Sequence, residues 1–169
     1  PGFGEKLFNW IKPIFSNLGE GDLRLYHAAC LLHDTTWKAH PDYRAEMSFE
    51  TVTRTNLGGI NHQGRIFLAL ALMSRYKKMH VSRSLKIPLL ILGESRAEEA
   101  IILGRAMRLG AMVSGTSAVN LKKCKIFTKE KTLYLNLRKS GKDLAAGIVE
   151  RRLKALADGM NMKYSLLIS

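Results

Sequence analysis

The spacing of apolar residues changes close to residue 118, and this change predicts two kinds of structure in one chain. Up to that point apolar residues recur at helical spacing, so helices separated by glycine, proline and asparagine signals are expected. Beyond it the stretch KKCKIFTKEKTLYLNLRKSG alternates apolar and polar positions, which is typical of two strands joined by a turn at 128–131. An amphipathic helix over 142–161 and a last strand over 162–169 follow. The predicted fold class is therefore α+β, mostly α.

Five helices are predicted before the period changes. They cover residues 4–19, 22–34, 41–56, 62–78 and 95–115, with an irregular stretch at 79–95 that Pro88 and Gly93 interrupt. Asp22, Asn61 and Ser95 are the expected N-cap residues, because each short polar side chain can accept a hydrogen bond from a backbone N–H of the first turn. The helix at 62–78 is apolar almost all round, so it should be the buried centre. Glycines inside the last helix imply close packing against a neighbouring helix.

The expected organisation is a helical bundle at 1–118 with a β-β-α-β tail at 119–169 packed on it as one structural unit. The chain has 169 residues, of which 46% are hydrophobic, and this suffices for an ordinary core. Because charges interrupt every long apolar run, no membrane span is expected. Cys30 and Cys124 lie in unrelated segments, which favours unpaired thiols and a reduced, cytoplasmic location.

The formal net charge is +13, and the excess is concentrated in two regions. Residues 51–93 contain no acid, and Glu130 is the only acid between residues 100 and 142. Such a field attracts polyanions, so polyphosphate, nucleic acid, an anionic membrane or an acidic neighbouring domain are candidate partners. The residues expected to bind a polyanion are Arg65, Arg75, Lys77, Lys78 and Arg83 in the first region and Lys122, Lys123 and Lys125 in the second. Aromatic residues are not expected to interleave with the basic runs, and this argues against a stacking platform for single-stranded nucleic acid.

An apolar run, HAACLLHD, ends in the adjacent pair His33 and Asp34. Metal-dependent phosphohydrolases of the HD type use such a pair, with a second His and a distant Asp, to hold a divalent metal that activates water. One hypothesis is therefore a phosphohydrolase with His33 and Asp34 as catalytic residues and with His27, His33, Asp34 and His62 as ligands of Mn, Fe, Ni or Zn. His27 and Asp34 are seven residues apart, which places them on nearly the same helix face. Against this hypothesis, Gly110 stands where the distant Asp is required, and no His precedes His27.

Four blocks, in order, carry a resemblance to a known family. They read LRLYHAACLLHDTTWKAHPDYRAEMSFETV, LGGINHQGRIFLALALMSRY, LGRAMRLGAMVSG and GIVERRLKALADGMNM. They resemble the C-terminal region of the exopolyphosphatase / guanosine pentaphosphatase (Ppx/GppA) family, of the alphaproteobacterial kind. The resemblance implies an HD-like helical fold that helps to hold polyphosphate, and commonly a homodimer. It also implies that catalysis and Mg²⁺ belong to N-terminal actin-like domains, which nothing in these residues resembles.

The leading hypothesis is therefore a non-catalytic C-terminal domain that binds polyphosphate, with no catalytic residue, metal or cofactor of its own. Three alternatives stay open: the HD-type phosphohydrolase, a nucleic-acid-binding module, and a purely structural or dimerisation domain that docks its basic faces on an acidic partner. Polyphosphate and guanosine pentaphosphate both stay open as substrates of the parent enzyme.

Overall fold

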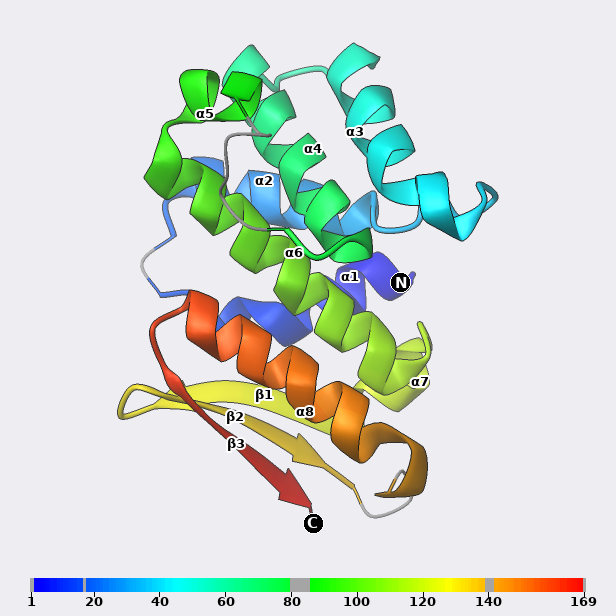
Figure 1. Ribbon diagram of the computed structural model, residues 1–169, viewed down its shortest axis with the longest axis vertical. Helices are drawn as coiled ribbons and strands as arrows, with labels where there is room; N and C mark the ends of the chain where they lie inside the picture. The colour runs from blue at the N-terminus through cyan, green and yellow to red at the C-terminus, as the bar shows by residue number, and fades with distance from the viewer. Residues whose placement is uncertain (1, 17, 80–85, 139–141, 169) are drawn as a thin grey trace. The chain divides into compact units, whose positions relative to one another are not determined.

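The computed structural model describes residues 2–16, 18–79, 86–138 and 142–168, except for the side chains of residues 142–146. By its internal contacts the chain divides into two compact units (Figure 1). Unit 1 consists of Pro1–Gly19 and Arg105–Ser169, and unit 2 consists of Glu20–Gly104. The long helix α6 (Glu94–Ser114) contributes to both units. The division into 1–118 and 119–169 stays a prediction. The internal contacts group the first helix with the tail, and they do not determine how the two units are placed relative to one another.

Unit 2 is helical and is built around α4. Its elements are α2 (Glu20–Leu31), the 3₁₀ helix η2 (Pro41–Tyr43), α3 (Arg44–Arg54), α4 (His62–Tyr76), α5 (Lys86–Leu92) and the first half of α6. Every residue from Ile66 to Leu72 is buried, as expected for a helix that is apolar all round. The side chain of Asn61 accepts a hydrogen bond from the N–H of Gly64 at 2.8 Å, which confirms Asn61 as the N-cap.

Two other N-cap predictions for unit 2 are wrong. Helix α2 begins at Glu20, so Asp22 lies in its first turn, where a carboxylate is stabilised by the helix dipole, and forms an ion pair with Arg96. Helix α6 begins at Glu94, directly after Gly93, whose φ of +77° only glycine adopts readily. In both cases the helix extends further toward its N-terminus than the polar side chain suggested, so Ser95 is also a residue of the first turn.

Two segment predictions also need correction. The helix expected to reach Asp34 ends at Leu31, and turns follow it. The stretch expected to be irregular is helical at Lys86–Leu92, because Pro88 occupies the first turn, where a helix requires no N–H donor. Residues 80–85 of that stretch lie outside the described residues.

The glycine inside the N-terminal half of α6 allows close packing of two helices. A Cβ on Gly104 would lie 2.3 Å from the carbonyl oxygen of Ala71 and 2.6 Å from the Cβ of Ser74, both on α4. The hydroxyl of Ser74 donates a hydrogen bond to the carbonyl of Ile101 at 2.9 Å. The backbones of α4 and α6 therefore approach as closely as the sequence predicted.

Unit 1 contains the sheet. Its elements are α1 (Phe3–Ile11), the 3₁₀ helix η1 (Lys12–Ile14), the end of α6, α7 (Ala118–Leu121), β1 (Cys124–Lys129), β2 (Thr132–Leu137), α8 (Lys142–Gly159) and β3 (Lys163–Ile168). The sheet order is β1-β2-β3, with β1 antiparallel and β3 parallel to β2. The α+β class and the β-β-α-β tail are thus confirmed. Helix α7 was not predicted, because its four residues are too few to show a helical period.

The two faces of the sheet differ in chemistry. On the inner face Ile126, Leu133 and Leu135 are buried, and α8 lies along this side (Figure 1). The turn between β1 and β2 consists of Glu130 and Lys131, both at positive φ, as a tight hairpin requires. None of the helices in the described parts of the chain has the length and apolar character needed to cross a membrane.

Candidate polyanion interface

The His-Asp pair lies in the turns after α2, and residues of α4 contact His33. The buried ring of His33 has its Nε2 3.9 Å from an oxygen of Asp34, whose side chain is exposed. On the other side of the ring, Nη2 of Arg75 lies 3.3 Å from Nδ1. The hydroxyl of Tyr76 donates a hydrogen bond to the backbone carbonyl of His33 at 2.7 Å. Burial lowers the pKa of His33, and the neighbouring guanidinium of Arg75 lowers it further, so the neutral ring is favoured.

This pair is not part of a metal cluster in the structure. Among the described residues, no group of three or more His, Cys, Asp or Glu side chains could hold a metal ion. The set His27, His33, Asp34 and His62 is therefore not brought together. Because α2 ends at Leu31, Asp34 does not continue the helix face that carries His27. Arg75 lies at Nδ1, on the opposite side of the ring from Asp34, so its cation adds positive charge near the pair without occupying the space between Nε2 and the carboxylate.

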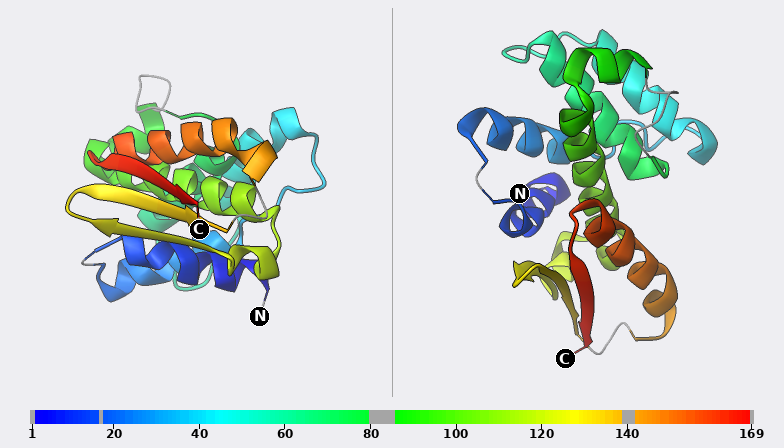
Figure 2. Two further views of the ribbon diagram at one scale, coloured as in Figure 1. Left: turned by 90° about the horizontal axis from the view of Figure 1, so that it is seen from below. Right: turned by 60° about the vertical axis from the view of Figure 1, so that its left-hand side comes forward.

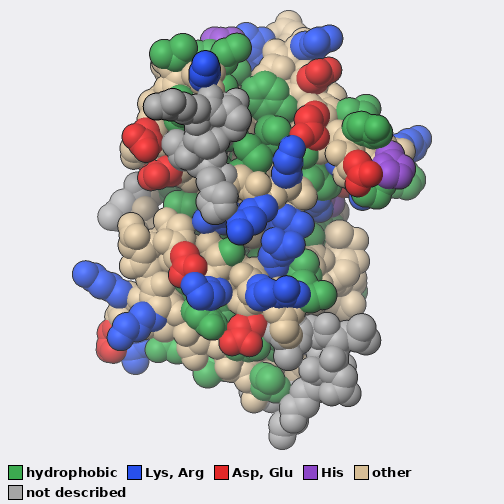
Figure 3. All heavy atoms as spheres, viewed as in Figure 1, with side chains coloured by type: hydrophobic (Ala, Val, Ile, Leu, Met, Phe, Trp, Pro, Cys, Tyr) green, Lys and Arg blue, Asp and Glu red, His purple; other side chains and the backbone are tan. Residues whose placement is uncertain are grey.

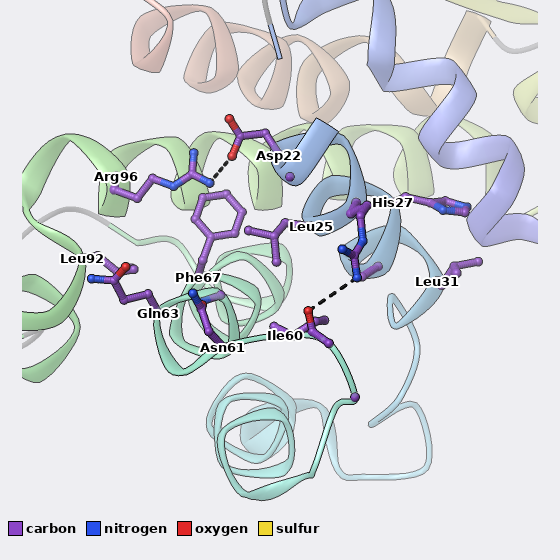
Figure 4. A pocket seen from close by; sticks show the side chains of 16 residues that line it. Asp22, Leu25, His27, Leu31, Ile60, Asn61, Gln63, Phe67, Leu92 and Arg96 are labelled. Atoms are coloured by element: carbon purple, nitrogen blue, oxygen red, sulfur yellow. Dashed lines mark hydrogen bonds and ion pairs between the residues drawn. The ribbon is translucent and has the colours of Figure 1, made fainter. Parts of the chain in front are cut away.

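Unit 2 also contains a pocket between α2, the loop before α4 and the start of α6 (Figure 4). Its volume is about 540 Å³, and Leu25, Phe67 and Leu92 supply part of its apolar wall. The guanidinium of Arg96 pairs with Asp22 and with Glu99 and lies 4.3 Å from the centre of the Phe67 ring. Arg96 is thus paired with two acids, whereas Arg24, the other arginine of the lining, donates a hydrogen bond to the carbonyl of Gly59 at 3.5 Å.

The first predicted basic cluster does not form a single exposed surface. Arg75 is buried against His33, and its Nε has no hydrogen-bond partner among the described residues. Arg65 is half-buried, also with an unpaired Nε. Lys77 donates a hydrogen bond to Glu46 at 2.8 Å, which lowers the pKa of that carboxyl group. Lys78 is exposed. Arg83 lies outside the described residues.

The second basic cluster is larger than predicted and is ordered by the sheet. Strand alternation places Lys125 and Lys129 on the outer face of β1, away from α8. The pairing register aligns Lys129 with Thr132 and Lys163, which adds Lys163 from β3 to the same face. We call Lys125, Lys129 and Lys163 the lysine face. Seen from below, the three strands lie in front of α8, so this helix leaves the outer face uncovered (Figure 2).

Three further lysines flank the lysine face. Lys122 and Lys123 directly precede β1, and Lys131 lies in the hairpin turn. All six side chains are exposed, and within the described residues none forms an ion pair with an acid. Basic side chains gather around this turn in the space-filling view (Figure 3). The structure therefore presents six lysines at one edge and one face of a small sheet, with Glu130 in the same hairpin turn as Lys131.

The expectation that aromatic residues stand apart from the basic runs is wrong. Phe127 lies between Lys125 and Lys129 on the outer face of β1, and Tyr134 lies opposite it on β2. The two rings stack with their centres 5.1 Å apart and their planes 11° from parallel. The period-2 alternation of KIFTK already indicated that residues 125, 127 and 129 share a face. The addition of Lys163 depends on a long-range parallel pairing that no local pattern shows.

A comparison with known protein families identifies the family of this chain. The family model described as exopolyphosphatase, C-terminal, matches residues 5–167, which is nearly the whole chain. A search among curated proteins found no match.

Proposed function

The chain belongs to the exopolyphosphatase C-terminal domain family, and we propose that it is the part of such an enzyme that helps to hold the polyphosphate chain rather than the part that cuts it. The observation that carries this proposal is the group of six exposed lysines around the sheet, none of which forms an ion pair with an acid among the described residues. The pocket of unit 2 and the first basic cluster lack such a group.

Polyphosphate is a line of closely spaced negative charges that carries condensed counterions. Lysines that contact it release these counterions, and this release drives binding without a shaped pocket. Along β1 the Cα atoms of Lys125 and Lys129 are about 14 Å apart, at 3.4 Å per residue, and that of Lys163 lies two strands away, about 10 Å across the sheet. The lysine face therefore offers several phosphate contacts over a flat area, which suits a flexible chain.

The His-Asp pair plays a structural part in this proposal. We propose that unit 2 is an HD-like scaffold in which His33 is a buried structural residue, contacted by Arg75 at Nδ1, and holds no metal. Catalysis, and the Mg²⁺ that supports it, would then belong to N-terminal domains of the parent enzyme. The chain by itself should not release phosphate from polyphosphate or from guanosine pentaphosphate.

Binding and hydrolysis can be measured on the same preparation. Calorimetric titration of the chain with polyphosphate at low and at moderate salt should show binding that weakens steeply with salt. A phosphate-release assay in the presence of Mg²⁺ or Mn²⁺ should show none above the rate without protein. Absence of binding at low salt would refute the proposed role, and metal-dependent release that Asp34→Ala abolishes would instead support the HD-type hydrolase.

A further inference from the structure

The outer face of the sheet carries an aromatic pair that polyphosphate binding does not explain. Phe127 and Tyr134 occupy the middle row of this face, directly opposite one another, with Ser165 next in the row. Phe127 is 36% exposed, although it lies on a strand whose inner-face neighbour, Ile126, is buried in the core. Polyphosphate has no apolar surface, so the lysines alone would serve it.

The composition of the face around this pair is equally specific. The row on one side contains Lys125, Asn136 and Leu167, and the row on the other side contains Lys129, Thr132 and Lys163. No acidic residue is among the nine residues of the outer face. Aromatic rings therefore lie at the centre of the face, with cations on both sides about 7 Å away along β1, at 3.4 Å per residue.

We propose that this face binds single-stranded nucleic acid, with unpaired bases stacking on the Phe127–Tyr134 pair and the phosphates on both sides contacting Lys125, Lys129 and Lys163. Every base has a flat π-face, so such stacking tolerates any sequence. The separation of rings and lysines follows the chemistry of the ligand, in which flat apolar bases alternate with charged backbone groups. A duplex presents phosphates but keeps its base faces stacked inside, so it could use the lysines and not the rings.

This inference depends on the rings, whereas the proposed function depends on the lysines, so the two can fail separately. Fluorescence anisotropy with a labelled single-stranded RNA of mixed sequence gives the affinity of the intact chain. The same titration with single-stranded DNA tests whether the 2′-hydroxyl contributes, and titrations with duplex and with polyphosphate give the reference affinities. All are made at one fixed salt concentration, because charge contacts dominate the absolute values.

Two substitutions remove a ring, and one control keeps it. Tyr134→Ala and Phe127→Leu should each weaken binding of single-stranded RNA by about 5- to 100-fold, since loss of one stacked base costs about that much. Phe127→Leu retains apolar bulk and so guards against a folding defect, which circular dichroism and the melting temperature also check. Tyr134→Phe keeps the ring and should stay within about twofold of the unchanged chain, since stacking persists. Polyphosphate affinity should not change in any of the three variants.

The result that overturns the inference is equal RNA affinity in the unchanged chain and in both ring-removing variants, or duplex binding as tight as single-strand binding. If RNA binding depends on the rings while polyphosphate does not bind at all, the inference stands and the proposed function fails. If polyphosphate binds and RNA binding ignores the rings, the inference fails and the proposed function stands.

Discussion

Removing the charge of the lysine face should change how steeply polyphosphate binding depends on salt. The perturbation is the triple substitution Lys125→Gln, Lys129→Gln and Lys163→Gln. These side chains are exposed and without ion pairs among the described residues, so glutamine should leave the fold intact while removing three of the six lysines around the sheet.

The magnitude follows from the number of contacts. With the coefficient for single-stranded nucleic acids, about 0.7 per phosphate contact, six contacts give a slope of log K against log salt of about −4. Raising the salt fourfold should then weaken binding about 300-fold. With three contacts left the slope is about −2, and the same change of salt should weaken binding only about 20-fold.

The assay is a set of titrations with polyphosphate at four salt concentrations, for the unchanged chain, the triple variant and a control. The control replaces Lys38, Lys78 and Lys86, three exposed lysines of unit 2, with glutamine and removes the same formal charge. It should keep most of the original slope. Equal slopes in the lysine-face variant and the control would refute the assignment, because binding would then respond to net charge and not to this surface.

Three other predictions concern the scaffold. The pKa of His33 is lowered in the folded chain, so on acidification the unfolded chain takes up a proton near pH 6.5, before the folded chain does. The free energy of unfolding should therefore fall as the pH drops below about 6.5. His33→Gln should reduce this fall, measured by urea unfolding at pH 7.5, 6 and 5. Gly104→Ala should lower the free energy of unfolding in urea by about 1–3 kcal/mol, because the new Cβ would lie 2.3 Å from the carbonyl oxygen of Ala71. The control Gly147→Ala, where nothing lies within 4 Å of the new Cβ, should raise it by about 0.5–1 kcal/mol. Equal effects of the two substitutions would contradict the packing argument. Since no metal cluster is found in the described residues, EDTA should leave the calorimetric melting temperature unchanged, and a drop would point to a structural metal.

The sequence predicted most elements because their signals are local. The apolar period of α4, the cap at Asn61 and the alternation of β1 and β2 each lie within a short segment. The N-cap predictions for α2 and α6 were wrong because each helix begins before the polar residue chosen: Asp22 pairs with Arg96 from the first turn of α2, and α6 begins directly after Gly93. Helix α5 was missed because its Pro88 was interpreted as a break and not as a first-turn residue.

The candidate sites depend on contacts between distant residues, and sequence alone predicted these less well. Arg75 lies 3.3 Å from Nδ1 of His33 although 42 positions of the chain separate the two residues, and no local pattern shows this contact. Lys163 joins Lys129 through Thr132, which requires the parallel pairing of β2 and β3. The absence of an Asp at Gly110 was, by contrast, visible in the sequence.

The most direct test of the central claim is an NMR titration of the isotope-labelled chain with polyphosphate at low salt. The quantities measured are the chemical shifts of its backbone amides and lysine side chains. The account predicts that the largest changes occur in β1, at the hairpin turn and at Lys163, and that they disappear as salt is raised. Largest changes around the pocket of unit 2 or around His33, or no changes at low salt, would contradict it.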